Sequence, residues 1–199
     1  MKQFLLLRAS HDICQVEIEH IQTVARMHGL EPRVHLVDSQ ESLNSLEQYT
    51  FEFDYIYLAS HANPDGFGDQ QFFVPWFSFA HVICPLNMFT DRAVFLLACC
   101  RGGVEKVSYD IFAGCDRIQF VCGPRWKVTA PDLTVGFHTF IYNMENRRLQ
   151  PNQAAERASH ATGFDFLCYD RVEIERKPEF ERHRGAIWEK QPVPVVQAV

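Results

Sequence analysis

Two hydrophobic runs of the chain each end on side chains that can do chemistry. "YIYLA" leads into Ser60 and His61, and "AVFLLA" leads into Cys99 and Cys100. A thiol is a strong nucleophile when it is ionised, and a nearby imidazole promotes that ionisation and can later protonate a leaving amine. These residue types suit cysteine-dependent acyl transfer, provided that the fold brings His61 to one of the two thiols.

The alternative is that the cysteines are ordinary core residues, because cysteine is among the most buried residue types. Both runs, however, end where a strand is expected to give way to a loop. Gly102 and Gly103 then allow a sharp turn that exposes amides able to bind an oxyanion. Adjacent side chains of an extended chain point opposite ways, so only Cys99 or Cys100 can face His61.

The spacing of apolar residues predicts strands that alternate with helices along most of the chain. Ser10 or Asp12 is expected to cap the first helix, and Asp38 with Glu41 has the spacing of a capping box for the second. The expected strands span 2–8, 32–37, 53–60, 93–99 and 116–123, and the expected helices span 10–29, 38–49, 104–114, 131–146 and 151–161.

This alternation predicts an α/β fold with a mainly parallel central sheet and helices on both faces. We expect one domain over residues 1–199, with a charged C-terminal extension over about 170–199. Sheets of this kind bind ligands beyond the carboxyl ends of their strands, which is where His61 and Cys99 are expected.

Two segments fit the alternation less simply. Residues 62–90 contain several prolines and aromatic residues, which predicts a loop or hairpin followed by a short helix. In the extension, Val172 and Ile174 alternate with charged residues, which predicts an edge strand. The end of that tail is expected to be disordered or docked on a neighbour.

The composition narrows the class of protein. The 199 residues are 47% hydrophobic, which is enough for a sizeable core, and the net charge of −6 argues against a nucleic-acid partner. The first apolar run is too short for a signal peptide, and no run is long enough for a membrane span. We therefore expect a cytoplasmic protein whose seven cysteines are free thiols.

Metal and cofactor motifs are not found in the sequence. No C-x-x-C pair occurs, and the cysteines do not follow zinc-finger spacing. "DGFGDQ" lacks the third glycine of a dinucleotide-binding loop, and "RGGVEK" is not a phosphate-binding P-loop. The expectation is a protein without a metal or a cofactor.

Three motifs together resemble the caspase-haemoglobinase fold, the peptidase clan CD that contains caspases, separases and CHAT domains. "SHA" follows one expected strand and "LACCRGG" ends a later one, as in that clan, and the downstream order of glycine, Trp-x-Val and an aromatic-bearing helix also fits. The resemblance covers residues 50–160. The downstream residues that carry it are Gly123, Trp126, Val128, Phe137 and Phe140.

The resemblance assigns roles to individual residues. His61 would be the acid-base partner, and the CHAT pattern Leu-Ser-Ala-Cys aligns with "LLAC" and makes Cys99 the nucleophile. The caspase pattern, aligned on Arg101 and Gly102, selects Cys100 instead; we prefer Cys99 and keep Cys100 as the alternative. The amides of Cys99 and Ala62 would bind the oxyanion.

The resemblance also has departures. Ala62 stands where the clan usually has glycine, and alanine resists a positive φ. "WKVTAPD" has Lys127 and Ala130 where separases have the acidic residues that bind a basic P1 side chain, and Asp132 follows two residues late. Trp126 and Asp132 remain candidate substrate-binding residues, and the preference for a basic P1 residue is in doubt.

The leading hypothesis is a caspase-like cysteine endopeptidase that hydrolyses peptide bonds of a protein substrate and is controlled by a partner protein, since many relatives are. The first alternative is a caspase-fold interaction module with a degenerate dyad. The second is a generic doubly wound α/β binding domain whose cysteines are core residues, in which His61 and Cys99 would lie too far apart to meet.

Overall fold

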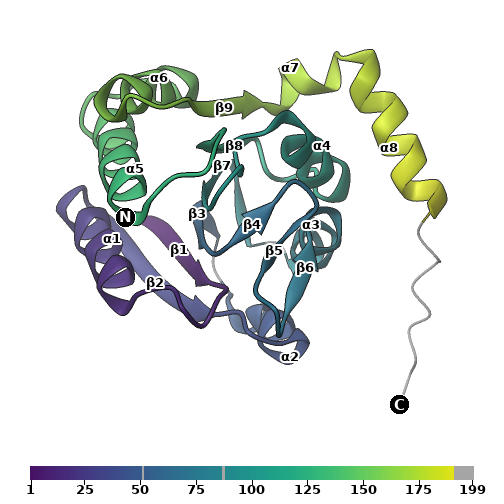
Figure 1. The fold of residues 1–199 in the computed structure, drawn as a ribbon, viewed down its shortest axis with the longest axis horizontal. Helices are drawn as coiled ribbons and strands as arrows, with labels where there is room; N and C mark the ends of the chain where they lie inside the picture. Colours follow the sequence, from purple (N-terminus) through teal and green to yellow (C-terminus); the bar gives the residue numbers. More distant parts are fainter. Residues whose placement is uncertain (51, 87, 191–199) are drawn as a thin grey trace.

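The computed structural model describes residues 1–50, 52–86 and 88–190, and its centre is a six-stranded sheet (Figure 1). The strand order is β2-β1-β3-β7-β8-β9, and all neighbours are parallel except β8 and β9. The strands are β1 (Lys2–Arg8), β2 (Leu30–Leu36), β3 (Phe53–Ala59), β7 (Phe89–Ala98), β8 (Phe120–Pro124) and β9 (Phe166–Asp170). The expected α/β fold with a mainly parallel sheet is thus confirmed.

Helices cover both faces of this sheet, as expected, and divide the core into two clusters. One face packs against α1 (Gln15–Met27), α5 (Ala130–Glu145) and α6 (Pro151–Thr162); we call it the α1/α5 face. The other packs against α2 (Gln40–Asn44), α3 (Trp76–Ile83) and α4 (Glu105–Gly114); we call it the α3/α4 face. Figure 1 shows the two groups of helices on opposite sides of the strands.

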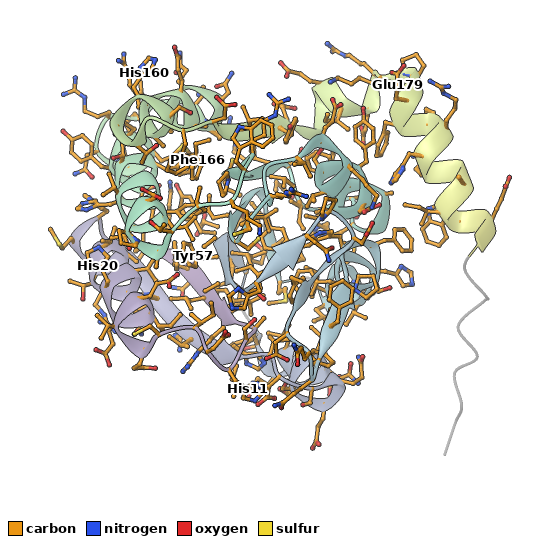
Figure 2. All side chains as sticks on the ribbon, viewed as in Figure 1. His11, His20, Tyr57, His160, Phe166 and Glu179 are labelled. Atoms are coloured by element: carbon orange, nitrogen blue, oxygen red, sulfur yellow. The ribbon has the colours of Figure 1, made fainter. Side chains whose placement is uncertain are left out.

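Aromatic side chains fill the space between the sheet and α5. The rings of Tyr57 and Phe137 lie 4.9 Å apart, and those of Phe137 and Phe166 lie 4.8 Å apart, both edge-to-face. Figure 2 labels Tyr57 and Phe166 at this layer. All three rings are almost completely buried, so they fix how α5 and its preceding loop sit on the sheet.

The starts of the first two helices differ from the predictions. The first helix begins after Cys14, whose side chain makes no capping bond, so neither Ser10 nor Asp12 is its cap. The second begins after Ser39, whose Oγ accepts from the amide of Ser42 at 3.1 Å while the Ser42 hydroxyl accepts from the Ser39 amide at 3.0 Å. The capping box is therefore real but lies one residue later than predicted, where serine takes the part expected of glutamate.

The segment after His61 forms the expected hairpin and short helix. Three short antiparallel strands make a second sheet, and α3 follows directly. The hairpin lies just beyond the carboxyl end of β3. The Gly68 amide donates to the His61 carbonyl at 2.9 Å and so joins the hairpin to this strand end. The strands are β4 (Ala62–Asn63), β5 (Gly66–Gly68) and β6 (Phe73–Pro75), and a 3₁₀ turn covers Ser45–Gln48 and another Cys84–Leu86.

The C-terminal extension folds as helices, so the predicted edge strand at Val172 and Ile174 is wrong. The edge strand is β9, which ends at Asp170; the Asp170 side chain then accepts from the Val172 amide at 2.7 Å and caps α7 (Arg171–Glu175). After α7, α8 (Pro178–Lys190) packs against α4. The predicted disordered or docked tail end, 191–199, lies outside the described residues.

Within the described residues, no helix is both long enough and apolar enough to cross a membrane.

Candidate active site at the carboxyl end of the sheet

The backbone of His61 is held firmly where β3 ends. Its amide donates to the Ser10 hydroxyl at 3.2 Å, and Ser10 and Ser60 bond to each other through their hydroxyls at 3.0 Å. Both serines are buried, so this polar contact lies inside the protein. The His61 imidazole, in contrast, is 58% exposed and free to meet a substrate.

Asp12 holds the His61 ring in place. Its carboxylate lies 2.8 Å from Nε2 of His61. Burial raises the pKa of the nearby Glu17 carboxyl above its usual value, and the His61 charge opposes part of that rise. An imidazole whose one nitrogen is bound by a carboxylate presents its other nitrogen, Nδ1, to a partner or substrate.

The sequence interpretation did not find this carboxylate. Asp12 was expected only as a helix cap, and it lies 49 residues before His61. The contact depends on β1 and β3 being parallel neighbours, which brings the loop after β1 to the loop after β3. No local signal in the sequence marks such a pair.

The structure places Cys99 inside the core. Its side chain is 2% exposed and belongs to the α3/α4 face, together with Leu58 and Leu97. Burial strongly raises the pKa of this thiol. A thiol that is protonated and shielded from solvent is a poor nucleophile, so this position does not suit the role that we expected for Cys99.

Cys100 points to the opposite face. Its side chain is partly exposed, and its Sγ lies 3.9 Å from the carbonyl oxygen of Val128, just before α5. This is the side of the sheet on which His61 meets Asp12, the residue shortly before α1. The alternation of an extended chain therefore separates Cys99 and Cys100 onto the two faces.

The pairing of β3 with β7 brings the segments that follow these two strands to the same edge of the sheet. Ala59 is the register partner of Ala98, and both belong to the α1/α5 face. The amide of Ser60 continues this ladder to the carbonyl of Ala98 at 3.4 Å. His61 and Cys100 each follow the end of their strand by two residues, on the side of the sheet where Asp12 and Val128 lie. This geometry favours Cys100 over Cys99, which reverses our order of preference.

A tight turn after Cys100 fixes its position. Arg101 adopts a positive φ of 60°, which is unusual for a residue with a side chain. The Gly103 amide donates to the Pro124 carbonyl at 2.9 Å, and a Cβ on Gly103 would lie 2.0 Å from the Gly123 carbonyl oxygen. Only glycine allows the two backbones to approach this closely.

The amide of Ala62 is directed away from the hairpin. The bond from the Gly68 amide to the His61 carbonyl identifies 61 and 68 as a hydrogen-bonded pair. Ala62 and Phe67 are then a non-bonded pair, whose amides point outward. Ala62 is not among the positive-φ residues, so the expected difficulty with alanine at this position does not arise.

Trp126 and Asp132, the predicted substrate-binding residues, have different surroundings. Trp126 is 53% exposed and lines a hollow of about 480 Å³ with Pro64, Arg101 and other residues. Asp132 instead accepts from the amide and the hydroxyl of Thr129 and so caps α5. These hydrogen bonds lower its pKa below the usual value. Trp126 is therefore exposed at a hollow, whereas Asp132 has a local structural role.

The hollow beside Trp126 is rich in cations. Arg101, Lys106 and Arg125 line it. Lys106 is paired with Asp65 at 3.2 Å and with Asp110 at 3.0 Å, and Arg125 lies 3.8 Å from Asp165. Within the described part of the chain, Arg101 has no acidic partner at ion-pair distance, so its charge is available to a ligand.

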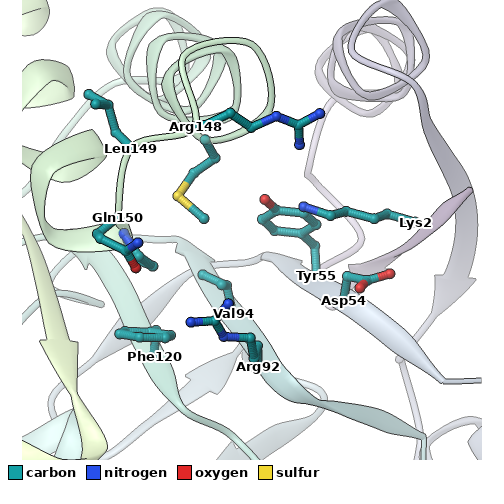
Figure 3. A pocket seen from close by; sticks show the side chains of 11 residues that line it. Lys2, Asp54, Tyr55, Arg92, Val94, Phe120, Arg148, Leu149 and Gln150 are labelled. Atoms are coloured by element: carbon teal, nitrogen blue, oxygen red, sulfur yellow. The ribbon is translucent and has the colours of Figure 1, made fainter.

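A more enclosed pocket lies at the other end of the sheet, as Figure 3 shows. It has a volume of about 270 Å³ and is lined by residues of β1, β3, β7 and β8 and by the loop after α5. Two of its cations share one carboxylate: Glu145 pairs with Lys2 at 2.6 Å and Arg148 at 3.8 Å, and it accepts from the Tyr55 hydroxyl. We assign it a structural role.

No family model matches this chain, and no curated protein matches it with significance.

Proposed function

We propose that the chain is a caspase-like cysteine endopeptidase in which Cys100 is the nucleophile and His61 the acid-base partner. One observation carries the proposal. An exposed imidazole held by a carboxylate follows β3, and a partly exposed thiol on the same face follows the adjacent strand β7. A nucleophile, a base and a group that orients the base are the parts that activated nucleophiles require. The motifs "SHA" and "ACCRG" resemble those of the clan, in the caspase register, with Ala62 in place of its glycine.

The chemistry would run in two stages. The Cys100 thiolate attacks the scissile carbonyl carbon, and His61 donates its proton to the leaving amine as the peptide bond breaks. A thioester to Cys100 remains. His61 then takes a proton from water, whose oxygen attacks the thioester and releases the acid and the thiol. The Ala62 amide and that of Cys100 are the proposed donors to the oxyanion.

The hollow beside Trp126 supports a substrate with a carboxylate side chain near the cleaved bond. Arg101 follows the nucleophile directly, and its guanidinium has the geometry to bind a carboxylate through two hydrogen bonds. Asp132 is the one acidic residue in the "WKVTAPD" segment, and its carboxylate already accepts hydrogen bonds from Thr129 at the start of α5. A basic P1 side chain is therefore not part of the proposal.

The test compares two adjacent cysteines in the full reduced chain. A peptide library is digested with wild type, Cys100→Ala and Cys99→Ala, with and without cell extract as a source of an activating partner. Cys100→Ala should lower kcat/KM by about 10³-fold or more, and Cys99→Ala by less than about threefold. Equal cleavage by wild type and Cys100→Ala would refute the assignment.

A second candidate function is a non-catalytic interaction module. The observation that favours it is the burial of Cys99, because the thiol in the CHAT register lies in the core. This alternative expects no cleavage by wild type even with extract, and unchanged partner binding in His61→Ala. Either cleavage that depends on Cys100 or loss of binding in His61→Ala would exclude it.

A further inference from the structure

Two thiols and a carboxylate meet far from the candidate active site, on the α3/α4 face. Sγ of Cys84, Sγ of Cys115 and a carboxylate oxygen of Asp116 all lie within 4.8 Å of one another. Cys84 directly follows α3, and Cys115 directly follows α4. The spacing of 31 residues between the cysteines hides the pair from any search for a zinc motif.

We propose that Cys84, Cys115 and Asp116 bind a divalent metal ion of the Zn²⁺ type. Two thiolates and one carboxylate are ligands that zinc accepts, and thiolates select against Mg²⁺ and Ca²⁺. Ligand atoms of a tetrahedral zinc site lie roughly 3.3–3.8 Å apart, so the cluster needs to contract by about an ångström. The proposal does not depend on the peptidase function.

The surrounding backbone favours a cation at this position. The C-terminal ends of α3 and α4 both lie at the cluster, and the partial negative charge of a helix C-terminus stabilises positive charge. The two helices approach closely because Gly114 of α4 lies against α3. A Cβ at this position would be 2.8 Å from both the Ala80 Cβ and the Phe77 carbonyl oxygen.

A buried arginine balances the ligand charge. Three negative ligands leave a net charge of −1 around a divalent ion. Arg171 is 6% exposed and donates to the carbonyls of Cys115 and Phe112, the latter at 3.2 Å, so its positive charge lies beside the cluster. Among the described residues, the acidic group at ion-pair distance from Arg171 is Glu175, which is 42% exposed and approaches at 2.8 Å.

The fourth coordination position would be open to solvent. The cluster lies on a hollow of about 460 Å³ that His81, Arg171 and Trp188 also line. His81 lies on α3, the helix that Cys84 directly follows, and its ring lies 5.6 Å from the ring of Trp188. Water can complete a tetrahedral site, and an open position of this kind is typical of zinc sites that bind a further ligand.

Cobalt provides a direct probe of these ligands. The full chain, stripped of metal and kept reduced with a phosphine, is titrated with Co²⁺ and then with Zn²⁺. We expect one Co²⁺ per chain, with a thiolate-to-cobalt charge-transfer band and the visible bands of a tetrahedral site, and displacement by Zn²⁺. Cys84→Ser should weaken Co²⁺ binding by about 100-fold or more, and Asp116→Asn by about tenfold.

The chain contains a matched control. Cys122 and Cys168 are register partners across β8 and β9, and among the described residues they belong to no group of three candidate metal ligands. Cys168→Ser should leave the cobalt spectrum and affinity unchanged, and the melting temperature of each variant verifies that it folds. The absence of a charge-transfer band in wild type, or an unchanged band in Cys84→Ser, would overturn the proposal. So would a Cys84–Cys115 disulfide accompanied by no cobalt binding after reduction.

Discussion

The two cysteine-bearing regions of the molecule differ in how sequence distance relates to distance in space. Cys99 and Cys100 are neighbours in the chain, yet they lie on opposite faces of the sheet, one in the core and the other beside the Val128 carbonyl. Cys84 and Cys115 are far apart in the chain, yet their sulfur atoms lie within 4.8 Å.

The difference shows that local structure can separate neighbouring thiols, whereas long-range packing can bring distant thiols together. The alternation of a strand separates adjacent side chains at no cost, because it is a property of the extended backbone. Only the packing of two helices, with Gly114 at their contact, joins the distant pair. The exposure and the neighbours of a cysteine therefore depend on the helix or strand that it follows and on what that element packs against. These in turn determine its chemistry.

The largest expected effect is the difference in alkylation between the adjacent thiols. Iodoacetamide should modify Cys100 about 100-fold faster than Cys99, because burial excludes the reagent from Cys99 and raises the pKa of its thiol. Mass spectrometry of each site over time measures both rates, and His61→Ala should slow only Cys100. Faster modification of Cys99 would reverse the assignment, and equally slow modification of both would favour the generic α/β domain.

Two glycine substitutions test the backbone approach on which each region depends. Gly103→Ala should destabilise the protein by about 3 kcal/mol or more, because its Cβ would clash with the Gly123 carbonyl. Gly114→Ala should cost about 1–3 kcal/mol, because it pushes α4 from α3. Urea unfolding measures both, and we expect Gly114→Ala also to weaken cobalt binding.

The matched control for these substitutions is Gly185→Ala. Gly185 lies in α8, and a Cβ there meets open space. Alanine should stabilise the helix by about 0.5–1 kcal/mol. If Gly103→Ala or Gly114→Ala proved equally harmless, the close approach inferred for that region would be incorrect.

The smallest expected effect concerns Asp12, a positioning residue. Asp12→Asn should lower kcat of the proposed peptidase activity about fivefold, with little change in KM, because the amide holds the His61 ring without the charge. The ion pair is exposed, so the melting temperature should stay almost constant. If Asp12→Glu restores kcat, the carboxylate acts by orienting the His61 ring and not only by stabilising the fold. An unchanged kcat in Asp12→Asn would show that Asp12 is not part of the site.

Much of the fold was predictable because it depends on local patterns. Apolar runs and helical spacing gave the five parallel strands and the helices α1, α4, α5 and α6, and the break after His61 gave the hairpin. The predictions failed where a short segment fits the pattern of both a strand and a helix. Alternation at Val172 and Ile174 resembled a strand, but the cap from Asp170 and the burial of Ile174 favour a helix there.

The sequence by itself determined that His61 and two thiols lie at strand ends, because those positions follow from local hydrophobic runs. It also determined that only one of the two thiols can face His61. The burial of Cys99, the partial exposure of Cys100, the meeting of Asp12 with His61, and the cluster of Cys84, Cys115 and Asp116 were decided by the tertiary structure. The reason is physical: strand register and helix packing are set by contacts between segments distant in the chain, and no local pattern encodes them.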